Sequence, residues 1–282
     1  MTPGGHRRIA FRTLLEFARR RDLSCRLLDF DPFELRLWHS LEQARSQDQF
    51  QKLIALAYEW LEDERKYLLA LLLEMLVEMR FSLTSVFDRL LAPIMAQVGD
   101  AWEDCMIDIG DERCMTQIVR DSLVYLRFRL LKKPDMLSNE PKPTAIVGCA
   151  PDEAHDLGAV MIHTLLEGAA WKVVYLGAGV PAEELAFQQM KHRASLVCVS
   201  LSSRNQAPNV RRLLRMLSHR YQANYPYRLA LGGGMLLRDG VDFDDLRLPF
   251  LDVQVFPDTS TFVQWIASFP EAPAKQRSKS RR

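Results

Sequence analysis

The chain has 282 residues, of which 48% are hydrophobic and 26% charged, and its formal net charge is +1. This length favours two domains with sizeable cores, and the balanced charge gives no global field that selects nucleic acid or a membrane. The five cysteines are scattered without a C-x-x-C pair, which argues against a zinc site and predicts reduced thiols. The most apolar run, Tyr67–Met79, is interrupted by Glu74 and Glu78, so we expect no membrane span and a cytoplasmic protein.

The first residues predict a basic turn, TPGGHRRI at 2–9, followed by a short helix over Ile9–Arg20. Residues 25–46 are interpreted as a connector with apolar anchors. Apolar residues then recur with a helical period, which predicts four helices over 47–61, 64–79, 84–103 and 109–131. Pro93 is expected to kink the third helix, and Asp108 is expected to cap the fourth. Short loops between these helices indicate an antiparallel four-helix bundle over 47–133.

The second half of the chain alternates between apolar strands and helices. A proline-rich linker over 134–143 precedes it. Strands are predicted over 144–149, 172–176, 196–200, 228–231 and 252–256, and helices over 157–167, 181–193, 207–219 and 258–268. This alternation predicts an α/β fold with a doubly wound parallel sheet over 144–270, of Rossmann-like (flavodoxin-like) type. Residues 271–282 are expected to form a basic, disordered tail.

Polar and glycine-rich segments follow the strands of this predicted sheet. In chain order they are Glu153-Ala154-His155-Asp156-Leu157-Gly158, Leu176-Gly177-Ala178-Gly179, Ser200-Leu201-Ser202 and Gly232-Gly233-Gly234. Because the carboxyl ends of parallel strands share one edge, these segments can line one crevice. The histidine is a good transition-metal ligand, and a carboxylate on its other ring nitrogen would fix the tautomer. Since the crevice offers one strong ligand, the metal would have to arrive inside a macrocycle.

The spaced pattern Glu153-x-His155-x-x-Gly158, Ser200-x-Ser202 and Gly232-Gly233 is similar to the signature of cobalamin-binding domains. YLGAGVPAEEL, over 175–185, also resembles a segment of that family. The resemblance implies base-off cobalamin binding with His155 as the lower axial cobalt ligand and Glu153 as its orienter. It implies that the nucleotide tail enters beside Gly158, Ser200, Ser202, Gly232 and Gly233, and that the helical bundle is a cap over the corrin. A hydrogen-bonded turn histidine, or a pocket of the same fold that binds nothing, stays an alternative.

A second pattern in the bundle, Val98-Gly99-Asp100-Ala101-Trp102 and then Glu112-Arg113, resembles CarH/LitR-type light-sensing transcriptional regulators. In that family the tryptophan and glutamate contact the upper axial adenosyl group, which implies this role for Trp102 and Glu112. Both could equally serve the bundle core and the helix dipole. Glu103 and Arg113 stand where the family has histidines, so capture of cobalt by a second histidine after illumination is not expected.

The start of the chain resembles the wing and last helix of MerR-like, excisionase-type winged helix-turn-helix domains. Residues 1–24 would then be a remnant or a truncated form of that module. The resemblance places His6, Arg7 and Arg8 at wing positions that contact the DNA backbone, which orient a protein without reading sequence. A solvated basic turn is the other interpretation.

These patterns predict a cobalamin-binding regulator and not an enzyme. Loss or exchange of the upper group, driven by light or ligand supply, would control oligomerisation (dimer or tetramer) and so binding to DNA or another partner. Adenosylcobalamin or hydroxocobalamin is the expected cofactor. One alternative is a corrinoid carrier protein for methyl transfer. Another is a sensor on the same scaffold that binds haem or a bilin such as biliverdin.

Overall fold

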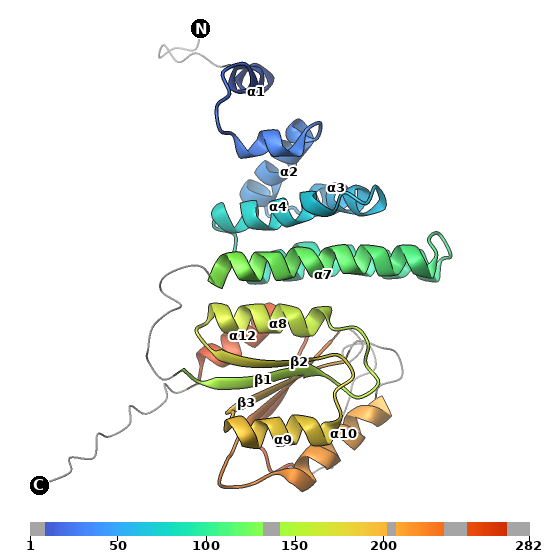
Figure 1. The fold of residues 1–282 in the computed structure, drawn as a ribbon, viewed down its shortest axis with the longest axis vertical. Helices are drawn as coiled ribbons and strands as arrows, with labels where there is room; N and C mark the ends of the chain where they lie inside the picture. The colour runs from blue at the N-terminus through green and yellow to red at the C-terminus, as the bar shows by residue number, and fades with distance from the viewer. Residues whose placement is uncertain (1–8, 132–141, 202–206, 234–246, 270–282) are drawn as a thin grey trace, which may run out of the picture. The chain divides into compact units, whose positions relative to one another are not determined.

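The computed structural model describes residues 9–131, 142–201, 207–233 and 247–269 (Figure 1). The chain forms two compact units, Met1–Leu126 and Arg127–Arg282. The expected linker over 134–143 lies almost wholly outside the described residues, and the division between the units falls near the end of a long helix. None of the described helices is long and apolar enough to cross a bilayer.

The first unit is helical. Its elements are α1 (Phe11–Arg20), η1 (Arg26–Phe30), α2 (Glu34–Gln47), α3 (Gln51–Glu62), α4 (Lys66–Glu78), α5 (Leu83–Val86), η2 (Phe87–Leu91), α6 (Ala92–Glu103) and the first part of α7 (Ile109–Leu131). Four helical stretches therefore lie where the bundle was predicted. The first of them begins at Gln51 and not at 47, because Asp48 adopts a left-handed conformation that ends α2.

The interpretation of residues 25–46 as a connector was wrong. The segment contains the short helix η1 and the 14-residue helix α2. The missed signal is the spacing of Leu37, Leu41 and Ala44, which are all buried and recur at helical intervals along α2. α2 therefore packs as a true element of the unit.

Trp60 of α3 is at the centre of the first unit's core and is fully buried. Phe30 stacks on its ring at a centroid distance of 5.8 Å, and Phe33 meets it edge-on at 5.7 Å. Aromatic pairs in such geometries add about 0.5–1.5 kcal/mol beyond the burial of their area. α4 contributes a nearly continuous apolar surface, as its sequence predicts.

The third predicted helix contains a π-helical turn directly before its proline. η2 spans Phe87–Leu91, and the backbone N–H of Ala92 donates to the carbonyl of Phe87, five residues earlier. Pro93 then lies in the first turn of α6, which continues directly from η2, so it can donate no backbone hydrogen bond to the turn before it. The predicted irregularity is therefore present as a wide turn that precedes the proline.

The cap predicted for the fourth helix is confirmed. The backbone N–H of Asp111 donates to Asp108 Oδ1 over 2.8 Å, and the backbone N–H of Asp108 donates in return to Asp111 Oδ2 over 3.1 Å. This reciprocal arrangement satisfies two backbone donors at the start of α7.

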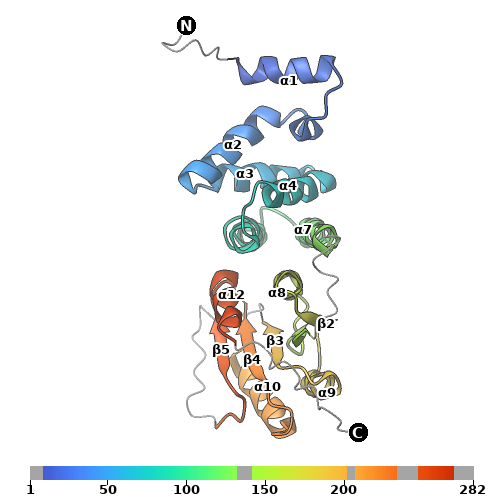
Figure 2. The same ribbon diagram turned by 90° about the vertical axis from the view of Figure 1, so that its left-hand side faces the viewer.

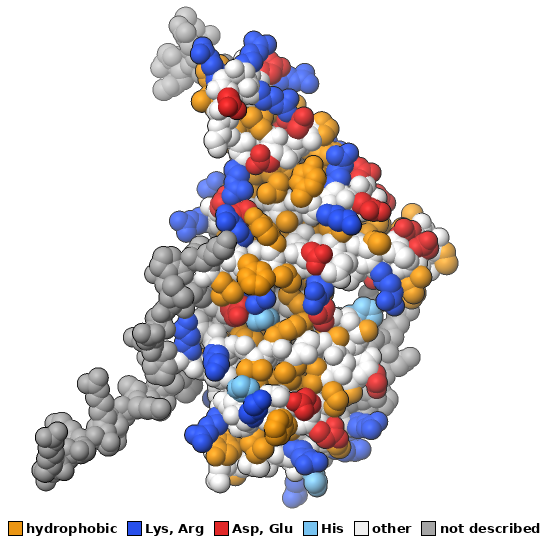
Figure 3. Space-filling model, in the orientation of Figure 1, with side chains coloured by type: hydrophobic (Ala, Val, Ile, Leu, Met, Phe, Trp, Pro, Cys, Tyr) orange, Lys and Arg blue, Asp and Glu red, His pale blue; other side chains and the backbone are white. Residues whose placement is uncertain are grey.

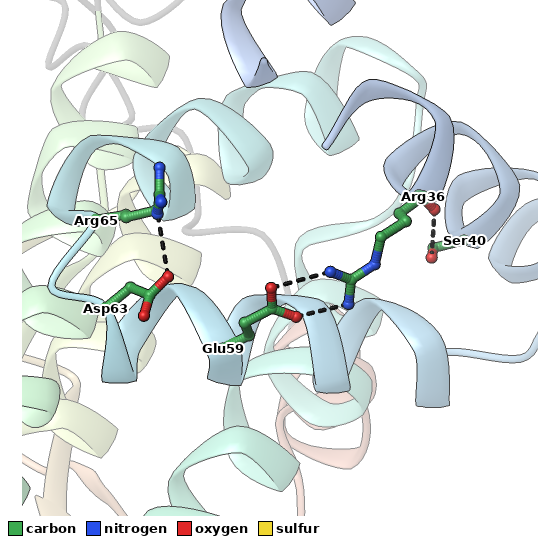
Figure 4. A network of polar contacts seen from close by, with 5 residues as sticks. All are labelled: Arg36, Ser40, Glu59, Asp63 and Arg65. Carbon is green, nitrogen blue, oxygen red and sulfur yellow. Dashed lines mark hydrogen bonds and ion pairs between the residues drawn. The ribbon is translucent and has the colours of Figure 1, made fainter. Parts of the chain in front are cut away.

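A network of charged side chains joins α2 to α3 on the surface (Figure 4). Arg36 binds Glu59 with two hydrogen bonds of 2.9 and 2.6 Å, and Arg65 bonds to Asp63 over 3.2 Å. The hydrogen bond from Arg36, aided by its charge, lowers the pKa of Glu59 despite partial burial.

The second unit is a parallel sheet covered by helices on both faces. After the end of α7 come β1 (Thr144–Cys149), α8 (Leu157–Gly168), β2 (Lys172–Gly177), α9 (Ala182–His192), β3 (Leu196–Ser200), α10 (Ala207–Arg220), β4 (Arg228–Gly232), β5 (Val253–Phe256) and α12 (Thr259–Ala267). All described pairings are parallel, in the order β2-β1-β3-β4-β5. The doubly wound fold predicted from sequence is confirmed.

Helices cover the two faces of this sheet in pairs. α8 and α12 lie on one face, and α9 and α10 lie on the other (Figure 2). Each face buries its own apolar cluster, with Leu185, Leu214 and Tyr227 on the α9/α10 side and Leu166, Phe262 and Ile266 on the α8/α12 side. The strand order reverses between β1 and β3, and ligands of such sheets bind beyond the strand ends at this reversal.

Candidate functional site

His155 lies in the loop between β1 and α8, where the strand order reverses. Its Nδ1 lies 2.8 Å from Oε1 of Glu153, and its backbone N–H donates to the same oxygen over 2.8 Å. The Glu153 side chain is fully buried, whereas 61% of the His155 side chain is exposed. The structure therefore places Glu153 in direct contact with the ring that the sequence predicts it to orient.

This contact sets which ring nitrogen is available. Oε1 of Glu153 accepts the backbone N–H of His155, so it acts as an acceptor toward Nδ1 as well, and Nδ1 carries the hydrogen. In the neutral imidazole Nε2 then holds a free lone pair, which is the form that ligates a metal. Because most of the ring is exposed, that lone pair is accessible from outside the domain.

The backbone ties the loop after β1 to its neighbours. The N–H of Gly179 donates to the carbonyl of Glu153 over 2.8 Å, and the N–H of Ala150 donates to the carbonyl of Ser200 over 2.9 Å. Segments that follow β1, β2 and β3 therefore meet, as expected from their positions after parallel strands. Backbone hydrogen bonds therefore hold the loop that carries His155 against the segments that follow β2 and β3.

Gly158 and Ser200 face each other across the reversal of strand order. A Cβ built on Gly158 would lie 3.0 Å from Oγ of Ser200, which is 8% exposed at the end of β3. The sequence placed both residues beside the nucleotide tail, and the structure brings them together. The absent side chain leaves a gap next to a buried hydroxyl, which suits the approach of a ligand to the backbone.

Gly232 and Gly233 lie at the end of β4, beside the segment that follows β3. Gly233 has φ +136°, and a Cβ there would stand 1.8 Å from the carbonyl oxygen of Leu201. The N–H of Leu201 donates to the carbonyl of Gly232 over 2.8 Å. The group that leaves no room for a side chain at Gly233 is therefore a backbone carbonyl of the same chain.

A second polar network, which the sequence did not suggest, leads away from the His155 loop. The hydroxyl of Tyr175 donates to Asp156 Oδ2 over 2.9 Å, and the Tyr175 ring stacks on His163 at 4.9 Å and 16°. His163 in turn lies 3.2 Å from Glu167. The only sequence signal for this cluster is the i, i+4 spacing of His163 and Glu167.

Arg127, the first residue of the second unit, completes that network. Its guanidinium lies 3.0 Å from Glu167 and 3.2 Å from Nε2 of His163. Burial opposes ionisation of Glu167, but the hydrogen bonds from His163 and Arg127 outweigh it and lower the pKa of the carboxyl group. The cluster is therefore an ion-pair network that joins Arg127 to α8, although the Nε of Arg127 is buried without a hydrogen-bond partner.

Cys149 lies beneath the loop and is not a reactive thiol. Its Sγ contacts the carbonyl oxygen of His155 at 3.6 Å. Burial, with smaller contributions from the charges of Asp156 and Glu153, raises the pKa of Cys149 to about 12. A thiol held neutral in this way is a poor metal ligand or nucleophile.

The candidates Trp102 and Glu112 belong to the first unit. Trp102 lies near the end of α6 with 46% of its surface exposed, so it is not a core residue of the bundle. Glu112 is in the first turn of α7 and accepts a hydrogen bond of 2.9 Å from the hydroxyl of Thr116. Glu103 and Arg113, at the places where the resembling family has histidines, are exposed.

Other predicted site residues lie outside the described parts of the chain. These are Ser202 and the candidate DNA contacts His6, Arg7 and Arg8. Across the described residues, no group of three or more His, Cys, Asp or Glu side chains could hold a metal ion. Among the described residues, His155 is therefore a candidate ligand that stands outside any such group.

Parts of the chain are similar to known proteins. Residues 143–258 match the family model of the B12 binding domain. The chain is 32% identical over 114 residues to the HTH-type transcriptional repressor CarH of Myxococcus xanthus, in a match that covers 40% of this chain and 36% of that protein. It is 26% identical over 147 residues to the repressor CarA of the same organism, covering 52% of this chain and 46% of that protein. The chain thus spans less than half the length of either relative.

A solved structure shares the fold. The monomethylamine corrinoid protein of Methanosarcina barkeri superposes with a TM-score of 0.58 at 16% sequence identity, covering 78% of this chain and 98% of that one. A helical region followed by a Rossmann-like domain is therefore common to both. The match to the family model of the B12 binding domain lies within the second unit of the present chain.

Proposed function

We propose that the second unit binds cobalamin through His155 and that the protein is a cobalamin-dependent regulator. The observation that carries the proposal is the 2.8 Å contact between Glu153 Oε1 and His155 Nδ1, which leaves the exposed Nε2 as a metal ligand. In this role His155 would hold the cobalt through Nε2, and Glu153 would fix the tautomer and orientation of the ring.

The residues present fit a metal that brings its own equatorial ligands. The described residues offer no cluster of three metal-binding side chains, so a bare ion would lack coordination. Because Gly158 has no side chain, a ligand could approach the backbone there, beside the buried hydroxyl of Ser200. When bound, the cofactor supplies a cobalt centre with an exchangeable upper ligand.

The regulator interpretation is favoured by the relatives, which are named as transcriptional repressors. The exposure of Trp102 supports it, because a large aromatic side chain left half-exposed is available to a ligand. Under this proposal Trp102 and Glu112 respond to the upper group of the cofactor. The state of that group then biases oligomerisation and binding to DNA or a protein partner, through different affinities for two arrangements.

A corrinoid carrier for methyl transfer is the second candidate. The fold match to a corrinoid protein of methylamine metabolism is the specific observation that favours it. A carrier must leave the upper face of its cofactor open to a methyltransferase. It would keep one oligomeric state whichever upper ligand is bound, whereas the proposed regulator would not.

Absorption spectroscopy of the full chain tests cobalamin binding. The protein is mixed with hydroxocobalamin or adenosylcobalamin in darkness, passed through a desalting column, and its spectrum is recorded. We expect retained corrinoid with a base-off, His-on spectrum that is lost in His155→Ala and weakened in Glu153→Gln. His39→Ala, which changes an exposed histidine of the first unit, is the matched control. Failure to retain either corrinoid would refute the proposal, and retention of haem or biliverdin instead would favour the alternative sensor.

Light scattering separates the regulator from the carrier. The molar mass of the adenosylcobalamin complex is measured in darkness and after illumination that removes the adenosyl group. The regulator predicts a change in molar mass that Trp102→Ala abolishes while corrinoid stays bound. An unchanged mass, together with methyl transfer to a thiol acceptor when the protein is loaded with methylcobalamin instead, would favour the carrier.

A further inference from the structure

A long segment of the second unit contains no acidic residue. Between Leu185 and Arg238 the sequence has one lysine and eight arginines and neither aspartate nor glutamate. The whole chain, by contrast, is almost balanced, with 37 Lys and Arg against 36 Asp and Glu. This segment therefore carries nine positive charges and no carboxylate, within a near-neutral chain whose first 26 and last eight residues are also basic.

The fold gathers this charge on one outer face. α10 buries its apolar side, formed by Val210, Leu213, Leu214 and Leu217, against the sheet. Its opposite side is exposed and carries Arg212, Arg215 and Arg220. We call these three, together with the exposed Lys191 and Arg193 at the end of α9, the α10 basic face.

α9 and α10 contribute to one surface because they pack side by side on the same face of the sheet (Figure 2). Both helices connect parallel strands, so they run in the same direction and their carboxyl ends lie together. Lys and Arg side chains are visible along these helices in the lower part of Figure 3. The α10 basic face thus extends from the middle of α10 to the edge of the sheet remote from His155.

In the described part of the second unit, Glu183, Glu184 and Asp252 lie away from this face. Glu183 and Glu184 lie in the first turn of α9, at the end opposite to Lys191, and Glu184 accepts a hydrogen bond of 2.6 Å from Gln188. Asp252 accepts a bond of 3.0 Å from the indole of Trp265 on α12, which covers the other face of the sheet. Uncompensated cations on a shared surface repel one another and favour an anionic partner.

The chemistry of the face selects among anionic partners. An amphipathic membrane helix needs exposed apolar side chains, but the described apolar residues of α10 are buried or partly buried. Four of the five cations are arginines, whose planar guanidinium groups match phosphate oxygens in pairs. Arg193 lies 5.4 Å from the ring centre of Tyr225, which orders its side chain at the surface.

We propose that the α10 basic face binds the phosphodiester backbone of duplex DNA without reading its base sequence. The α10 basic face includes none of the strand-end residues assigned to cobalamin. The DNA-binding proposal can therefore be tested independently of the proposed function. Contacts to four or five phosphates would give a slope of about −4 in log affinity against log salt concentration. Raising the salt from 50 to 200 mM would then weaken binding by about 150- to 500-fold.

Fluorescence anisotropy with a labelled 24-base-pair duplex of arbitrary sequence tests this proposal on the full chain without corrinoid. Arg212→Gln/Arg215→Gln should weaken binding at 50 mM salt by tenfold or more and reduce the salt slope by about 2. The matched control, Arg45→Gln/Lys52→Gln, removes the same charge from exposed positions of the first unit and should bind as the wild type does. Arg212→Lys/Arg215→Lys keeps the charge and should retain the slope.

Three outcomes would overturn the proposal. The first is no binding of the duplex by the wild type at 50 mM salt. The second is equal binding by the wild type and the Arg212→Gln/Arg215→Gln variant, which would move any DNA contact elsewhere in the chain. The third is binding of polyglutamate or phosphatidylserine vesicles, but not DNA, through the same arginines. Circular dichroism confirms that each variant is folded, so a loss of binding is attributable to the surface.

Discussion

Gly158 and Ser200 approach each other so closely that a methyl group on Gly158 would lie 3.0 Å from Oγ of Ser200. In Gly158→Ala the serine hydroxyl must move by a few tenths of an ångström, which is a small cost. Alanine in the first turn of α8 recovers up to about 1 kcal/mol of helix propensity. We therefore expect the free energy of unfolding to change by less than about 1 kcal/mol in either direction.

Cobalamin affinity should respond differently, because the methyl group fills the gap assigned to the nucleotide tail. We expect Gly158→Ala to raise the dissociation constant by about tenfold or more, equivalent to about 1.4 kcal/mol. Urea denaturation measures the stability, and titration followed by absorption measures the affinity. Unchanged affinity with unchanged stability would show that the tail lies elsewhere.

The α/β half of the fold was predictable because its strands are short apolar runs bounded by polar turns. β1 and β3 match the predicted ranges at both ends, and the other strands differ by one residue at one end. The helix α2 was not predicted because charged and polar residues separate its buried apolar positions, which form only a narrow stripe along the helix. Propensity is weak where half of the residues of a helix face solvent.

The candidate site was predictable only in part. The contact of Glu153 with His155 follows from their separation by two residues in a turn. The stacking of Tyr175 on His163 depends on how α8 lies over β2, and no local pattern specifies it. Likewise, the carbonyl that occupies the space at Gly233 comes from Leu201, in the segment after another strand.

Gly233 should tolerate no side chain. With φ +136° and a Cβ position 1.8 Å from a backbone carbonyl oxygen, Gly233→Ala forces the ends of β3 and β4 apart. We expect a loss of more than about 3 kcal/mol in the free energy of unfolding, or no folded second unit. The matched control is Gly99→Ala in α6, where nothing lies within 4 Å of the new Cβ. The control should stabilise the first unit by about 0.5–1 kcal/mol, and calorimetry reports both changes.

The Arg36–Glu59 pair should contribute little to stability, despite its two hydrogen bonds (Figure 4). Both side chains are more than a third exposed, so solvent screens their attraction to about 0.2–1 kcal/mol. Because the pKa of Glu59 is lowered on folding, this contribution is present above pH 4.5 and is lost as the pH falls through the folded value. A double-mutant cycle with Arg36→Ala and Glu59→Gln at pH 7 measures the coupling. A coupling above about 2 kcal/mol would contradict the surface assignment.

The bond from Tyr175 to Asp156 should support the His155 loop. Tyr175→Phe removes the donor and keeps the ring that stacks on His163. A hydrogen bond to a carboxylate contributes about 1.5–3 kcal/mol, so we expect a destabilisation of that order. Asp156→Asn should cost less in the Tyr175→Phe background than in the wild type, since the shared bond is already lost. If the effects of the two substitutions were additive, the two side chains would not be coupled, which would show that this hydrogen bond does not form in solution.

The cysteines should divide sharply in their reactivity toward thiol reagents. Cys105 and Cys114 are exposed, whereas Cys149 and Cys198 are buried. Burial raises the pKa of Cys149 to about 12 and raises that of Cys198 as well, so both stay protonated well above neutral pH. Since the thiolate is the reactive form, iodoacetamide at pH 8 should modify the two exposed residues and spare the two buried ones. Peptide mass spectrometry identifies the sites, and urea-unfolded protein, in which all five cysteines should react, including the half-buried Cys25, is the control. Modification of Cys149 in the folded protein at a rate similar to that of Cys105 would mean that the loop carrying His155 opens readily, against the hydrogen bonds that hold it closed.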